Sequence, residues 1–259
     1  MSQYNDHHGP EGLRVRGTIV VVPGRGETRA TYDRLGARLA ADAYRVRILD
    51  APPLDAEDPA ASLTAYAGRL ADAVEGTASE NGVVRPLVLV GADSGAAALA
   101  ALLGGTPDPA AAPRPDGLVL AGLPGPSTEA GTAVGTWSEE LDLRTSCPAH
   151  RGTLTQDPQV RRGSLADPVP DGILAAAYDG EVPVPTLLLV GDVDPLADHE
   201  ALARLAKSLP RARLSVVRDA RHDVLNDLQH RSVAAETVGF LEALREGLRP
   251  SVAVRSSAW

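Results

Sequence analysis

The residue with the clearest chemical potential is Asp93, which lies between two glycines in a short turn. The apolar run 87–90 comes before this turn, and an alanine-rich stretch follows it. A strand that enters a helix through such a glycine-bracketed turn lifts the central side chain above the sheet. Gly91 and Gly95 fit because the turn is crowded and its backbone strained. Counted from these glycines, the central residue is Asp93 and not Ser94.

Two later segments supply an acid and a base. An apolar run predicts a buried strand that ends just before Asp194. A second strand, predicted at 214–217, leads into the loop that carries His222. The chain order is therefore nucleophile, acid and histidine, in which the acid orients the imidazole that acts as general base. Asp192 and Asp198 are the fallback acids.

Segment 17–27 adds a third motif, in which an apolar strand runs into a glycine-rich loop. With the other motifs, it resembles the α/β-hydrolase superfamily over residues 14–248, and within it the compact monoglyceride-lipase and lysophospholipase-like enzymes. The resemblance implies a mostly parallel central sheet with helices on both faces and a small lid insertion. It also implies an oxyanion hole made by the backbone N–H groups of Arg25 and Ser94. The loop of these lipases usually begins with His-Gly, and Pro23 replaces that histidine here.

An aspartate at the apex changes the chemistry that such a scaffold supports. A serine must first lose its proton, whereas a carboxylate is already ionised at neutral pH. Dehalogenases and epoxide hydrolases use a carboxylate to attack saturated carbon, which gives an alkyl-enzyme ester. His222 would then activate water, with Asp194 holding its imidazole. Attack of Asp93 on an ordinary ester would form an unfavourable anhydride, so plain lipase chemistry is not expected.

Alternatives remain open at the apex. The turn can also be read with Ser94 as the nucleophile, which would give a Ser94-dependent esterase or thioesterase. Asp93 can instead cap the following helix in a protein that binds a ligand without catalysis, because anions are stabilised at helix N-termini. The guanidinium of Arg25 faces either the pocket or solvent.

The expected function is that of a cofactor-independent enzyme that hydrolyses a small, largely apolar metabolite through Asp93, His222 and Asp194. Haloalkane dehalogenation is discounted, because a tryptophan usually holds the halide where Ser94 stands. Epoxide hydrolysis is weakened, because it usually needs two lid phenols and the lid offers only Tyr178, with His150 as a substitute. The runner-up is a non-hydrolytic proton transfer of specialised metabolism, as in a cyclase, lyase or isomerase.

The elements that must position these residues alternate between short apolar strands and helices, which predicts an α/β fold with a parallel sheet covered on both faces. Residues 1–12 are polar and predicted to form a flexible tail, and residues 13–259 a single domain. The segment at about 123–184 breaks the alternation and is predicted to be a lid or cap over the pocket. The lid side chains expected to contact substrate are Trp137, His150 and Tyr178.

Composition narrows the function classes further. The chain has 259 residues, enough for one large domain, and a net charge of −9 that argues against nucleic acid as a partner. The single cysteine, Cys147, excludes an internal disulfide, and no spacing of His, Cys or acidic residues indicates a metal site. The absence of a signal peptide and of a long apolar run predicts a cytoplasmic protein without a membrane span. The composition is typical of a high-GC bacterial genome. The expected partner is a small-molecule substrate, no cofactor is expected, and homodimer formation is left open.

Overall fold

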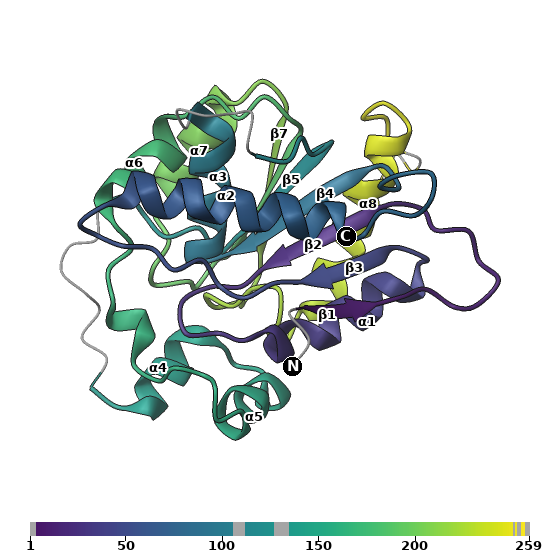
Figure 1. Ribbon diagram of the computed structural model, residues 1–259. Coiled ribbons are helices and arrows are strands. Elements are labelled where there is room, and N and C mark those ends of the chain that lie inside the picture. Colours follow the sequence, from purple (N-terminus) through teal and green to yellow (C-terminus); the bar gives the residue numbers. More distant parts are fainter. Residues whose placement is uncertain (1–3, 106–111, 127–134, 251, 253–254, 257–259) are drawn as a thin grey trace.

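The computed structural model describes residues 4–105, 112–126, 135–250, 252 and 255–256, and strands from this part of the chain form one twisted sheet (Figure 1). The strand order is β1-β3-β2-β4-β5-β6-β7, and every neighbouring pair is parallel except β1 with β3. This confirms the predicted mostly parallel sheet. The strands are β1 (Asn5–His7), β2 (Thr18–Val22), β3 (Arg45–Ile48), β4 (Leu87–Ala92), β5 (Gly117–Ala121), β6 (Thr186–Gly191) and β7 (Ala212–Val217).

Helices cover both faces of the sheet, as the continuous apolar strands predict. Alternate strand residues pack against α2, α3, α6 and α7 on one face and against α1 and α8 on the other. None of the helices in the described part of the chain has the length and apolar character needed to cross a membrane. The helices are η1 (Arg29–Tyr32), α1 (Asp33–Ala41), α2 (Pro59–Glu75), α3 (Ser94–Gly105), α4 (Trp137–Arg144), α5 (Pro148–Gln156), η2 (Ser164–Ala166), α6 (Asp171–Asp179), α7 (His199–Ser208) and α8 (His230–Arg245).

The N-terminal segment differs from the flexible tail that was predicted for residues 1–12. Residues 5–7 form β1, which pairs with β3 at the edge of the sheet. Side chains hold the strand there, because Arg47 binds both carboxylate oxygens of Asp6 at 2.7 Å and His7 contacts Asp33 at 3.0 Å. These partners lie on distant elements, so a reading of local composition misses them.

The segment predicted as a lid, 123–184, contains two α-helices outside the sheet layers and one α-helix that belongs to the main core. Residues 127–134 of this segment lie outside the described part of the chain. Helices α4 and α5 lie apart from the sheet layers, at the bottom of the view in Figure 1, and share a small apolar cluster of their own. Helix α6 instead packs along α3 and buries Ile173 and Leu174 in the main core. The second half of the segment therefore belongs to the helical layer over the sheet.

The carboxyl ends of the parallel strands bring the predicted site residues to one edge of the sheet. Arg25 follows β2, Asp93 follows β4, Asp194 follows β6, and His222 lies in the loop after β7.

Candidate active site

The turn after β4 places Asp93 at its apex. Asp93 has φ 47°, a left-handed conformation that a non-glycine residue rarely adopts outside special turns. A Cβ on Gly91 would lie 2.7 Å from the backbone of Ala96, and one on Gly95 would lie 2.5 Å from the carbonyl oxygen of Pro23. Both glycines are therefore required by close backbone approach, which fixes the register of the turn with Asp93 at its centre.

His222 lies between two carboxylates. Its Nε2 is 3.1 Å from Asp93 Oδ1, and its Nδ1 is 3.0 Å from Asp194 Oδ2. All three side chains are buried. Burial alone would lower the pKa of His222, but the charges and hydrogen bonds of Asp194 and Asp93 outweigh it and raise this pKa to about 10. The ring is thus an imidazolium that donates to both carboxylates, and the hydroxyl of Ser94 is not its partner.

The loops around His222 and Asp194 fix both side chains. The backbone N–H of His222 donates to Leu143 O at the end of α4. Asp194 also accepts from the backbone N–H of Leu196. Of the fallback acids, Asp192 is exposed and Asp198 caps α7 through the N–H of Ala201, so Asp194 is the acid in contact with the imidazole.

Arg25 binds both oxygens of the Asp93 carboxylate. Its backbone N–H donates to Oδ2 at 2.7 Å and its Nε–H to the same oxygen at 2.9 Å, while Nη2 donates to Oδ1 at 2.7 Å. Its Nη1 reaches the carbonyls of Leu165 and Asp167 in the lid segment. Burial alone would raise the pKa of Asp93, but Arg25 and His222 hold it well below its usual range. The guanidinium is therefore buried away from solvent and bound to Asp93 and to the lid carbonyls, and Arg25 also lines the pocket beside the apex.

A pocket of about 280 Å³ opens beside the apex. Arg25 and Ser94 belong to its lining, whereas Asp93 and His222 do not. An exposed ion pair between Arg161 and Asp167 borders it. Much of the remaining wall is apolar and comes from the loop after β3 and the segment before α6: Ala51, Pro52, Leu54, Pro168, Val169 and Pro170. This space is at the lower end of the size range of small-molecule sites.

The three lid side chains expected to contact substrate do not line this pocket. The indole N–H of Trp137 donates to Thr155 Oγ1 within the α4–α5 unit. The Tyr178 hydroxyl donates to the carbonyl of Pro124, and His150 is buried against Asp223. Each polar group thus has a partner in the fold: the neighbouring helix for Trp137, the loop after β5 for Tyr178 and the loop of His222 for His150.

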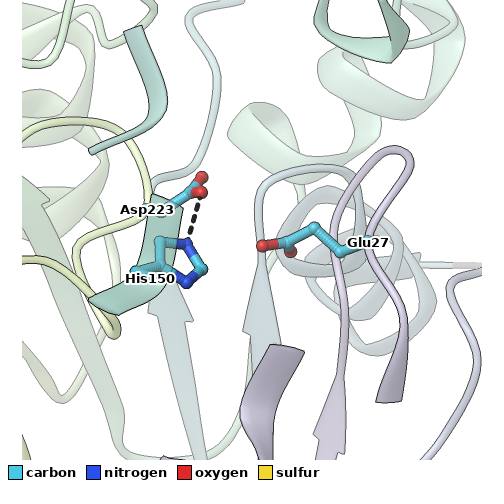
Figure 2. Close-up of side chains that lie close together, drawn as sticks. All are labelled: Glu27, His150 and Asp223. Atoms are coloured by element: carbon cyan, nitrogen blue, oxygen red, sulfur yellow. Dashed lines mark hydrogen bonds and ion pairs between the residues drawn. The ribbon is translucent and has the colours of Figure 1, made fainter. Parts of the chain in front are cut away.

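A second buried charge cluster, which the sequence analysis did not identify, lies next to the first. Figure 2 shows Glu27 from the loop after β2 facing His150 of α5 and Asp223, the residue after His222. Burial and then the charge of Asp223 raise the pKa of Glu27 to about 7. Arg144 and Glu140, both fully buried on α4, border the cluster. No local spacing could have indicated it, since its members come from three distant segments.

Comparisons with known proteins agree with this architecture. The family model described as serine aminopeptidase S33 matches residues 14–229. A soluble variant of monoglyceride lipase from Saccharomyces cerevisiae superposes with a TM-score of 0.69 at 16% identity, covering 93% of this chain and 91% of that one. A monoacylglycerol lipase from Paleococcus ferrophilus gives 0.63 at 17% identity, with 93% and 98% covered. A type II thioesterase of the yersiniabactin pathway gives 0.60 at 20% identity, with 94% and 99% covered.

At these identities the superpositions establish the fold alone, and no curated protein matches the chain in sequence. The family model, in contrast, spans most of the chain, including the apex turn, the acid loop and the histidine loop. The protein therefore has the α/β-hydrolase fold and belongs to the serine aminopeptidase S33 family of α/β-hydrolase enzymes.

Proposed function

We propose that this chain is a hydrolase that forms an ester between Asp93 and a saturated carbon of a small, largely apolar molecule, and then hydrolyses that ester. The observation that supports this proposal is the unequal environment of the two carboxylate oxygens. Oδ2 accepts from the backbone N–H and the Nε–H of Arg25, at 2.7 and 2.9 Å. Oδ1 faces Nε2 of His222. One oxygen is thus held as a future ester carbonyl, and the other is beside the proton donor.

In the first step, Oδ1 of Asp93 attacks the substrate carbon. The new C–O bond forms as the bond to the leaving group breaks and the electron pair departs with that group. His222, whose two ring nitrogens both donate to carboxylates, supplies the proton to the departing group. Oδ1 must exchange its contact with Arg25 Nη2 for the substrate carbon, whereas the contacts to Oδ2 remain.

In the second step, water attacks Cγ of the Asp93 ester and His222 takes a proton from that water. Negative charge develops on Oδ2, where the two donors of Arg25 already lie within the 2.7–3.1 Å range required of an oxyanion hole. The bond from Cγ to Oδ1 then breaks, so the departing alcohol carries away the original Oδ1 and the water oxygen takes its place in Asp93. The alcohol takes the proton of the new carboxyl group. Asp93 returns to its ionised form and His222 to its protonated form.

The pocket beside the apex supports a small substrate with an apolar part. Its volume of about 280 Å³ limits the size of the ligand, and prolines and aliphatic side chains form an apolar part of a wall whose remainder is polar. A small molecule with a polarised carbon at one end would place that carbon toward the apex and its apolar part against this wall.

The experiment is to trap the ester. The His222→Ala variant is incubated with 1-bromobutane, whose bromide departs without a proton, and the Asp194→Asn variant, which keeps the imidazole, is incubated with styrene oxide. Both are analysed by intact mass and peptide mapping. We expect the mass to rise by that of the butyl group or of the whole epoxide, with the modification on Asp93. The wild-type protein, turning over the same probe in heavy-oxygen water, should gain the label in the Asp93 carboxylate. The matched control, Asp93→Asn, should show neither change.

Two outcomes would contradict this proposal and indicate a serine esterase instead. They are an adduct on Ser94, and p-nitrophenyl acetate hydrolysis that is lost in Ser94→Ala.

A second candidate function, non-hydrolytic proton transfer, is favoured by one observation. Arg25 Nη2 and His222 Nε2 both donate to Oδ1 of Asp93, so in the resting site neither carboxylate oxygen is free to attack carbon. An imidazolium beside a fixed carboxylate can still give and accept protons on a bound metabolite. Turnover without label in Asp93, lost in His222→Ala, would support this function over the covalent one.

A further inference from the structure

The cluster of Glu27, His150 and Asp223 plays no part in the proposed reaction. Each residue offers a donor atom, and these atoms lie within 4.8 Å of one another (Figure 2). All three side chains are at least nine-tenths buried. We propose that these three side chains bind a divalent transition-metal cation, with Zn²⁺ as the ion that fits their donor set best.

The strongest indication is an oxygen of Glu27 that has no partner. Oε2 accepts from the backbone N–H of Gly24 at 2.9 Å and from the hydroxyl of Tyr32 at 2.5 Å. Oε1 is fully buried and receives no hydrogen bond. Figure 2 shows this carboxylate directed toward His150 and Asp223. A buried acceptor without a donor is costly, and such groups point to an ion or a water.

The other two donors lie close to the spacing of metal ligands. His150 Nε2 and Asp223 Oδ2 are 2.8 Å apart. Zinc binds nitrogen and carboxylate oxygen at about 2.0–2.2 Å in a tetrahedral arrangement, so two of its ligand atoms are separated by about 3.4 Å. The pair would therefore lose the proton of its hydrogen bond and move apart by about half an ångström to bind one ion, and Glu27 would close the site.

The charges around the cluster also favour a divalent cation. Glu27, Asp223 and Glu140 bring three carboxylates and Arg144 brings a guanidinium, so negative charge is in excess when His150 is neutral, the form in which an imidazole binds a metal. Arg144 approaches Oδ1 of Asp223, at 3.6 Å, whereas His150 contacts Oδ2. The guanidinium and the ion would thus use different oxygens of Asp223.

The donor set indicates which ion. One imidazole with two carboxylates is the mixed nitrogen and oxygen environment that Zn²⁺ accepts, whereas Mg²⁺ and Ca²⁺ prefer oxygen alone. Because the three ligands come from the loop after β2, from α5 and from the loop of His222, the ion would fasten one lid helix to both sides of the active site.

The test is calorimetric titration of chelator-treated protein with zinc chloride. We expect one equivalent to bind, and Glu27→Gln, His150→Ala and Asp223→Asn each to weaken binding by at least about tenfold. The matched control is the His7→Ala, His8→Ala double variant. It removes two histidines that are neighbours in the sequence near the N-terminus and lie outside the proposed site, and one of them, His7, contacts Asp33. This control should bind zinc as the wild type does.

A measurement on the wild-type protein keeps the test valid if a variant fails to fold. One equivalent of paramagnetic Co²⁺ should broaden the imidazole resonances of His150 before those of His7. The proposal would be overturned if zinc binding depended on the N-terminal histidines, or if the wild type did not bind zinc stoichiometrically. The unpartnered oxygen of Glu27 would then be explained by an internal water.

Discussion

Two buried charge clusters lie side by side in this protein, and they differ in whether every carboxylate oxygen has a hydrogen-bond donor. In the first, Arg25 and His222 face Asp93 and Asp194, and each carboxylate oxygen has a donor. In the second, around Glu27 and Asp223, one buried oxygen lacks a donor and negative charge is in excess. The same two loops serve both, since Arg25 and Glu27 share one and His222 and Asp223 the other. A carboxylate is thus tolerated at the apex because Arg25 compensates it. In the neighbouring cluster the buried cation, Arg144, pairs with Glu140, and Glu27 Oε1 is left without a donor.

The largest effect is expected from Asp93→Asn, which breaks the first cluster at its centre. The change leaves the Arg25 guanidinium buried without its carboxylate, and removal of one partner of a buried ion pair typically costs about 3–5 kcal/mol. Asparagine tolerates the positive φ at this position, so backbone strain is not the cause. Denaturant unfolding should show the loss. Unchanged stability would mean that the pair contributes nothing to the fold.

Asp194→Asn should act on the reaction more than on the fold. The imidazole of His222 loses the carboxylate that holds its Nδ1, and general-base catalysis of ester hydrolysis should fall by about 10²–10⁴-fold. With a probe that alkylates Asp93, the variant should accumulate the ester that the wild type clears, as seen by intact mass. Asp192→Asn, at an exposed neighbouring acid, is the control and should clear the ester normally. If both variants accumulated the ester to the same extent, Asp194 would not be the acid that holds His222.

A double-mutant cycle over Arg25 and Asp93 should give a smaller, more specific effect. If the two side chains are needed mainly for each other, Arg25→Met with Asp93→Asn should cost less than the sum of the single changes. Contacting charged residues couple by about 0.5–3 kcal/mol, and in this pair the guanidinium donates to the carboxylate at 2.7, 2.9 and 3.2 Å. Additive losses in denaturant unfolding would argue that Arg25 serves the lid carbonyls and not the apex.

The difference between the clusters also explains what the sequence could predict. The sequence can place Asp93, Asp194 and His222 at one edge of the sheet, because each follows an apolar strand and parallel strands bring their carboxyl ends together. It cannot place the side chain of Arg25, because the partner of that side chain lies 68 residues away. The roles of Trp137, His150 and Tyr178 depended on how the lid helices pack, which local patterns do not encode. Glu27, His150 and Asp223 meet only in three dimensions, so no spacing in the sequence predicted them.

The smallest effect, and the one that separates the clusters most sharply, is expected from Glu27→Gln. Without metal, the change removes surplus charge and places an amide donor where an oxygen had no partner, so stability should rise by about 1 kcal/mol. With zinc in excess, the wild type gains binding energy that the variant lacks, and the order should reverse. Glu139→Gln, at an exposed glutamate of α4, should respond equally with and without zinc. Thermal unfolding of both variants with and without zinc measures this, and a gain for Glu27→Gln under both conditions would favour a bound water over a metal ion.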